Sequence, residues 1–235
     1  MALVYLYTSL GDLEAAQKIR ERMASLGASE SRLGFTDVLI NFAKSVTTQK
    51  PSDTADTLES INRLLPKIRH SQFEYGLVGF FALVQGDIQL SREIFLTSDP
   101  GWLEPGQWPE LVERFRRGAC MIAWVLMNTG DQELGTALLQ QATAYIEDSL
   151  PLVTEHFDWD HPEVCYLVAG DTEKALLSIE TELSHNHLYA WNAVHPLPMY
   201  DLIRHEPRFQ AATAEHARRI AVQREAIEPE RDAVE

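Results

Sequence analysis

A Gly-Asp pair recurs four times along this chain, each time between two stretches with helical periodicity. The pairs are Gly11-Asp12, Gly86-Asp87, Gly130-Asp131 and Gly170-Asp171. Glycine adopts the left-handed backbone conformation that ends a helix, and aspartate accepts hydrogen bonds from the free amides that open the next one. The last three pairs lie roughly 40 residues apart, and the first gap is about twice as long. The spacing predicts an all-α fold: a right-handed α-solenoid of helical hairpins with a C-terminal capping helix.

The apolar periodicity divides residues 1–227, which we expect to form a single solenoid, into five hairpin units and a terminal helix. The units span about 1–27, 31–68, 72–98, 110–149 and 160–184, and the terminal helix spans 207–226. The turn of the second unit lacks Gly-Asp, and Ser52 is the expected cap of its second helix. Residues 228–235 are rich in charge and predict a disordered tail. Because the first helix starts without a cap, we expect the chain to be a piece of a longer protein.

A linker rich in proline and glycine, 98–109, separates the third and fourth units. We expect Trp102 and Trp108 to hold it against the array, because an exposed pair of tryptophans is costly to leave in water.

The net charge of the chain limits the classes of partner that it is expected to bind. A formal net charge of -15 argues against nucleic acid as a partner, since phosphate binding needs clustered basic residues. No apolar run reaches the ~18 residues of a membrane-spanning helix, so we expect no membrane insertion. No export signal is visible, which favours a cytoplasmic location, or a periplasmic one if the parent protein has an upstream transmembrane segment. Cys120 and Cys165 are predicted to be buried free thiols.

The units share a pattern of large and small residues around the Gly-Asp turn. The third unit carries it as Tyr75, Val78, Gly79, Ala82, Gly86 and Ser91, the fourth as Ala119, Ile122, Ala123, Leu126, Gly130 and Gly135, and the fifth as Trp159, Tyr166, Gly170 and Ala175. The truncated first unit keeps Leu3, Val4, Tyr7, Gly11 and Ala16. Small residues fit where two helices approach closely. The pattern resembles the tetratricopeptide repeat.

The C-terminal stretch that contains Asp201, Arg204, Glu206, Pro207, Arg208 and Phe209 resembles the "DPLRxDPRF" ending of tetratricopeptide tails on bacterial multidomain signalling proteins. In that family the tail follows an adenylate or guanylate cyclase, a serine/threonine kinase or a winged-helix regulator. Taken by itself, the stretch predicts a turn and a capped helix that fold Leu202 and Phe209 onto the last groove.

Residues of metal-binding type cluster in two places, His156-x-Asp158-x-Asp160-His161 and His185-Asn-His187. Asp160 is better explained as a helix cap, and neither run has a second ligand group at a defined spacing, so we expect no metal site. We find no nucleophile triad, phosphate loop or nucleotide fingerprint, and we therefore expect neither a cofactor nor enzyme activity.

The first helix of each hairpin lines the concave face in tetratricopeptide arrays, and the resemblance places six residues there. They are Phe73, Phe80, Leu83, Arg117, Trp124 and Met127. One interpretation is an anchor groove for a partner helix or peptide. The other, slightly favoured, is that the array curls tightly and these side chains are part of its own packing.

The sequence therefore predicts a non-catalytic scaffold for protein–protein interaction, with a protein or peptide partner or an effector domain upstream in the same polypeptide. Two alternatives stay open. One is a small-ligand sensor that closes over an apolar cavity lined by Phe80, Trp124 and Trp159, and the other is a homo-oligomerisation element that uses the helix of residues 2–7.

Overall fold

The computed structural model describes residues 2–9, 11–68, 72–115, 117–153, 162–185 and 191–232, and every regular element among them is a helix. The α-helices are α1 (Ala2–Ser9), α2 (Leu13–Ser25), α3 (Glu30–Thr48), α4 (Pro51–Leu64), α5 (Gln72–Val84), α6 (Ile88–Ser98), α7 (Trp108–Phe115), α8 (Arg117–Asn128), α9 (Gln132–Val153), α10 (Pro162–Ala169), α11 (Thr172–Ser184), α12 (Trp191–Val194) and α13 (Pro207–Asp232). Short 3-10 helices are η1 (Leu65–Lys67), η2 (Pro100–Leu103), η3 (Pro105–Gln107) and η4 (Pro198–Leu202).

Neighbouring helices pair into hairpins, α1 with α2, α3 with α4, α5 with α6, α8 with α9 and α10 with α11. The turn chemistry expected from the Gly-Asp pairs is confirmed at the backbone: all four glycines have positive φ, between 72° and 106°. The side chains of Asp12, Asp87 and Asp171 each accept a hydrogen bond from an amide in the first turn of the following helix. Asp131, which precedes α9, accepts one from Arg92 Nη2 of α6 at 2.7 Å.

The second hairpin turns differently. Gln49 takes the left-handed conformation, with φ 53°, and Pro51 begins α4. The prediction of Ser52 as the cap is wrong, because α4 begins at Pro51, Ser52 lies inside the helix and Lys50 occupies the capping position. Proline is well suited to the first helical position, where its missing N–H is not needed.

The linker packs against the array through its two tryptophans, as predicted. Trp102 and Trp108 are both buried, and Trp108 Nε1 donates a hydrogen bond to the Trp102 carbonyl oxygen at 3.1 Å. The Trp102 ring also contacts Phe115, with 5.4 Å between the ring centroids.

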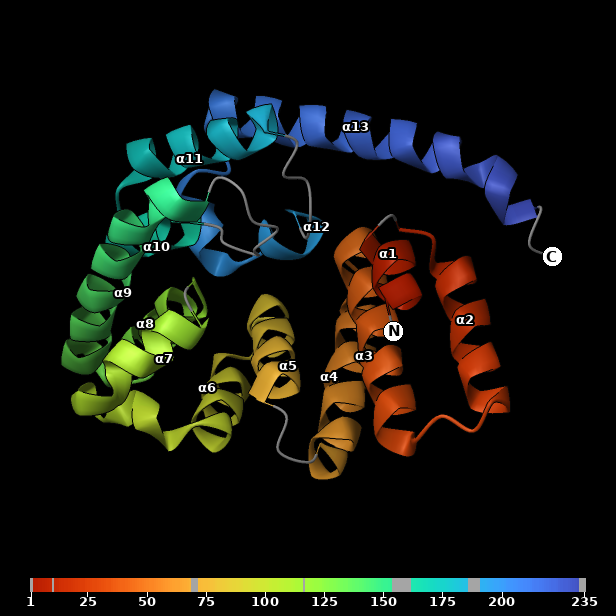
Figure 1. Ribbon diagram of the computed structural model, residues 1–235, viewed down its shortest axis with the longest axis horizontal. Coiled ribbons are helices and arrows are strands. Elements are labelled where there is room, and N and C mark those ends of the chain that lie inside the picture. Colours follow the sequence, from red (N-terminus) through yellow and green to blue (C-terminus); the bar gives the residue numbers. More distant parts are fainter. Residues whose placement is uncertain are drawn as a thin grey trace.

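The hairpins follow one another around an arc, and the C-terminal part of the chain closes it (Figure 1). Helix α12 and η4 lie inside the arc, while α13 crosses above them from α11 towards the N-terminal hairpin. Near the far end of α13, Arg224 Nη1 lies 3.9 Å from the position that a Cβ on Gly11 would take. The two ends of the array are therefore brought close together.

The predicted end of the terminal helix and the predicted disordered tail need correction. Helix α13 continues to Asp232 instead of ending at residue 226, so most of segment 228–235 is helical, and 233–235 lie outside the described residues. Phe209 is buried as expected, but Leu202 is 49% exposed and does not fold onto the array.

The two cysteines form a disulfide, so the prediction of free thiols is wrong. Cys120 of α8 and Cys165 of α10 are fully buried, with 5.2 Å between their Cα atoms. Each cysteine fits the apolar periodicity of its own helix, and that periodicity carries no information on the distance between two hairpins.

Candidate functional site

Four of the six residues predicted to line a groove have side chains in the described part of the structure, and two of these four are core residues. Phe80 and Leu83 are buried in the core. The Phe80 ring lies 6.1 Å from Phe42 of α3 and 5.6 Å from Phe81, measured between centroids. Phe80 therefore lies in the contact between α3 and α5. This position agrees with the interpretation that these side chains pack within the array.

Trp124 and Met127 of α8 are half-buried and pack against the core. Met127 faces α9, its partner in the hairpin: Thr136 Oγ1 donates to Met127 Sδ at 3.6 Å. Phe73 and Arg117 lie in α5 and α8, but their side chains are outside the described part of the structure. Among the side chains that the structure describes, Trp124 on α8 is thus the remaining candidate for the predicted anchor surface.

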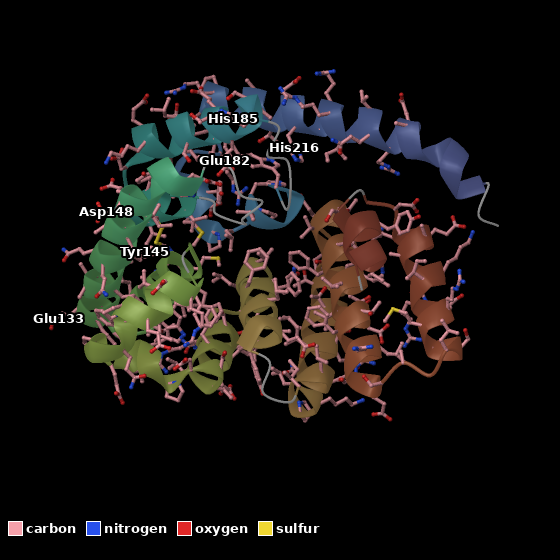
Figure 2. All side chains as sticks on the ribbon, in the orientation of Figure 1. Glu133, Tyr145, Asp148, Glu182, His185 and His216 are labelled. Atoms are coloured by element: carbon pink, nitrogen blue, oxygen red, sulfur yellow. A yellow bond between two sulfur atoms is a disulfide. The ribbon has the colours of Figure 1, made fainter. Side chains whose placement is uncertain are left out.

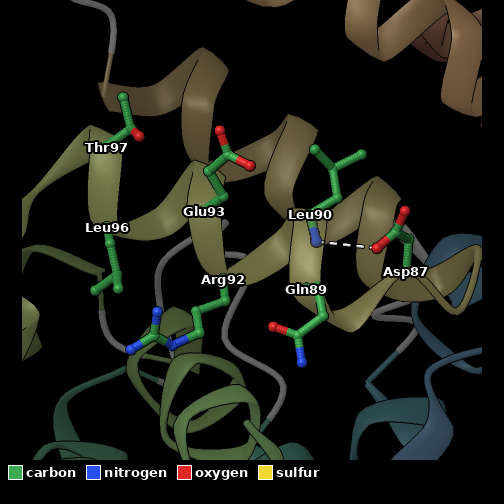
Figure 3. Close-up of a pocket in the computed structure, with 7 residues that line it drawn as sticks. All are labelled: Asp87, Gln89, Leu90, Arg92, Glu93, Leu96 and Thr97. Carbon is green, nitrogen blue, oxygen red and sulfur yellow. Dashed lines mark hydrogen bonds between the residues drawn. The ribbon is translucent and has the colours of Figure 1, made fainter.

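The cavity proposed for a ligand sensor is only partly testable, because Trp159 lies outside the described residues. A depression of about 550 Å³ does occur on α6 (Figure 3), and it is lined by Asp87, Gln89, Leu90, Arg92, Glu93, Leu96 and Thr97. Two of its charged groups already have structural partners, since Asp87 caps α6 through the Leu90 amide and Arg92 pairs with Asp131. The depression is open to solvent, and its lining mixes polar and apolar surface, which does not suit a buried apolar ligand.

The inside of the arc is occupied by the chain itself, by residues 191–203, which we call the inner segment. Its α12 contacts α3, and its η4 contacts α10. Its buried side chains are Trp191, Val194, Leu197, Met199, Tyr200 and Ile203. The sequence analysis assigned no helix to this region, which lies between the fifth unit and the terminal helix; the signal that could have identified it is the density of large apolar residues around its prolines.

Two polar contacts hold the inner segment in place. Tyr200 Oη donates to Glu163 Oε1 of α10 at 2.8 Å, and both residues are fully buried. Arg204 donates to two carbonyl oxygens of the segment, that of His195 at 2.9 Å and that of Leu197 at 3.1 Å. A guanidinium that binds two backbone oxygens fixes the path of the chain between them.

Aromatic rings surround Trp191. His195 stacks on it at 6.1 Å between centroids, and Phe209 and His216 of α13 lie 6.0 and 5.7 Å away. Figure 2 shows His216 below α13, on the side of the inner segment. The segment is therefore packed between α10 and α13.

Burial lowers the pKa of His195, because desolvation disfavours the charged imidazolium. The positive charge of Arg204 and the nearby His216 lower this pKa further, while the hydrogen bond from His195 Nδ1 to the Trp191 carbonyl opposes the shift. His195 is therefore neutral at pH 7.

Helix α13 is tied to α11 by Arg208, which makes paired hydrogen bonds to both oxygens of Glu180, each at 2.7 Å. The same guanidinium reaches Glu173 Oε1 at 2.8 Å. Hydrogen bonding to Arg208 lowers the pKa of Glu180. Arg204 and Arg208, singled out by their motif, thus act as structural clamps.

The first histidine cluster, residues 156–161, lies outside the described residues, as does His187. His185 Nδ1 pairs with the Thr181 carbonyl oxygen at 2.8 Å, at the end of α11. Within the described ranges no group of three or more His, Cys, Asp or Glu side chains is placed to hold a metal ion.

No protein-family model, curated protein or solved structure matches this chain. None of the helices in the described part of the chain combines the length and apolar character needed to cross a bilayer.

Proposed function

We propose that the chain is a helical-repeat scaffold of the tetratricopeptide type that binds a protein or peptide partner and has no catalytic activity. The observation that carries this proposal is the inner segment: the inner helices α3 and α10 already contact a stretch of chain that contains proline and large apolar residues. A surface that holds such a stretch within the molecule has the shape and chemistry to hold one from another molecule.

The small residues of the repeat pattern support the solenoid assignment. Ala82, Ala123 and Ala175 are all fully buried. Ser91 Oγ donates to the Gly79 carbonyl oxygen at 2.9 Å, across the α5–α6 hairpin. Close helix contacts thus fall at the positions where the repeat requires small side chains.

We further propose that the array is the C-terminal regulatory part of a bacterial signalling protein. The support is the C-terminal motif, whose Arg204, Arg208 and Phe209 all make contacts that close the array. The buried disulfide supports the periplasmic alternative over a cytoplasmic location, because disulfides form and persist in oxidising compartments.

Neither alternative function is favoured by a specific observation. The depression on α6 is open to solvent, unlike the closed cavity that a sensor would need. Helix α1 packs within its own chain against α2 and α3, where Val4 is fully buried.

Photo-crosslinking tests the proposed function. Benzoylphenylalanine placed at Trp124, on an inner helix, should give a covalent adduct with a partner protein in extracts of the cells that make the chain. The matched control is the same probe at Leu177, which is 58% exposed on α11. Adducts at both positions alike, or at neither, would contradict binding at the inner face, provided that the melting temperature of each variant is unchanged.

A further inference from the structure

We propose that the inner segment is an autoinhibitory contact. Residues 191–203 occupy the inner face in the folded chain, and a partner segment of similar chemistry must displace them. Protonation of His195 favours their release. The partner that the inner face fits is a short peptide with aromatic and aliphatic side chains around proline. This inference rests on the proposed function, since it concerns the same inner face.

The position of the inner segment suggests the inhibition. One end of it contacts α3, early in the array, and the other end contacts α10, late in the array. It lies within the arc, where the inner helices would otherwise face a partner (Figure 1). Most of the segment is in two short helices, α12 and η4, and Leu197 between them has φ -54° and ψ 142°.

The two ends of the segment are held differently. The α10 and α13 side has a buried hydrogen bond, from Tyr200 to Glu163, and the aromatic packing around Trp191. At the α3 end, α12 contacts α3, and Asp37 and Lys44 of α3 are paired with Arg20 of α2 and Asp53 of α4. We therefore expect release to begin where α12 meets α3, while the segment stays attached near α10.

His195 is placed to control that release, since it stacks on Trp191 at the start of the segment. Among the described residues, the charged and titratable groups that act on it are Arg204, which donates to the His195 carbonyl oxygen, and His216 from α13. On α10 the carboxylate of Glu163 accepts from Tyr200, and on α3 the charged Asp37 and Lys44 are paired as described above. A proton on the imidazole would add a positive charge beside Arg204 in a buried site.

The sign of the pH effect follows from the lowered pKa of His195. The released segment binds a proton near pH 6.5, the ordinary value for histidine, whereas the packed segment binds it only at lower pH. The packed form is therefore fully favoured above pH 6.5 and loses stability as the pH falls through that value towards the folded pKa.

The test uses the full chain and a fluorescein-labelled synthetic peptide with the sequence of residues 191–203 in which asparagine replaces His195, so that the peptide carries no histidine. We expect this peptide to bind up to about tenfold more tightly at pH 5.5 than at pH 7.5, the largest ratio that a free pKa near 6.5 allows, because apparent affinity scales with the fraction of chains whose inner face is free. His195→Asn, which keeps a donor near the Nδ1 position and stays neutral, should abolish the pH dependence. His185→Asn, at an exposed histidine, should preserve it.

Hydrogen exchange and circular dichroism accompany the binding measurement. After correction for intrinsic rates, exchange at pH 5.5 should rise in residues 191–203 and not in α8 or α9. Three outcomes would each overturn the proposal. They are equal affinity of the peptide at both pH values, no binding at either pH, and loss of helix throughout the chain at pH 5.5. None of these outcomes affects the crosslinking result at Trp124 at neutral pH, so the failure of this proposal is distinguishable from that of the proposed function.

Discussion

Gly135 is the position where the hairpin packing can be tested most sharply, by substitution with alanine. A Cβ there would lie 2.6 Å from the Ala123 carbonyl oxygen and 2.8 Å from the Met127 amide nitrogen, both backbone atoms of α8. Ordinary contacts between such atoms are about 3.5 Å or longer, so the backbones of α8 and α9 must move apart. Gly135 is not among the glycines with positive φ, and its backbone therefore accepts alanine without strain.

Gly76 provides the matched control, because it is also a helical glycine and a Cβ on it would meet nothing within 4 Å. Gly76→Ala should raise the free energy of unfolding by about 1 kcal/mol through helix propensity alone. Gly135→Ala gains the same ~1 kcal/mol but loses about 3 kcal/mol to overpacking, a net loss of about 2 kcal/mol.

Urea denaturation followed by circular dichroism measures both changes, with the slope m expected to stay that of the parent chain. A Gly135→Ala variant as stable as the parent would refute the close approach of α8 and α9 and, with it, the role assigned to small residues at these positions.

Three further predictions concern other parts of the molecule. Replacing both Cys120 and Cys165 by alanine should lower the free energy of unfolding by about 4 kcal/mol, which is the contribution of loop-closure entropy for their separation of 45 residues. In urea denaturation of this variant, a reducing agent should have no further effect. Trp102→Ala should lower the free energy of unfolding by about 3–5 kcal/mol, whereas Leu103→Ala, at a side chain 41% exposed, should change it by no more than about 0.5 kcal/mol. Equal effects of the two substitutions would contradict the burial of the linker. Hydrogen bonds from Arg218 and then Arg219 lower the pKa of Glu215 to about 2, so its carboxyl carbon should titrate there by NMR, and a midpoint near 4.5 would show that the pairing is absent in solution.

The local features of the fold were predictable from sequence. The positions of the turns followed from Gly-Asp, because a positive φ and a side-chain cap depend only on residues a few positions apart. The burial of Trp102 and Trp108 followed from the cost of exposing them. The pattern of small residues likewise anticipated which positions face the partner helix of each hairpin.

The candidate site was less accessible to sequence reasoning. Helical periodicity placed Phe80 and Met127 on the apolar face of their helices. It could not show whether that face lines an open groove or packs against another helix. The inner segment escaped notice because its contacts join residues far apart in the chain, such as Tyr200 and Glu163. No periodicity marks such a segment, which is neither a regular helix nor a strand.

The sequence by itself determined which residues form helices, where most of the helices turn, and that the chain is acidic with no long apolar span, since these properties depend on local hydrogen bonding and composition. The tertiary structure alone decided that Cys120 meets Cys165, that α13 continues over the N-terminal hairpin and that residues 191–203 fill the inside of the arc. These outcomes depend on the angles at which successive hairpins pack, and small differences at each joint add up over the array to decide which distant residues meet.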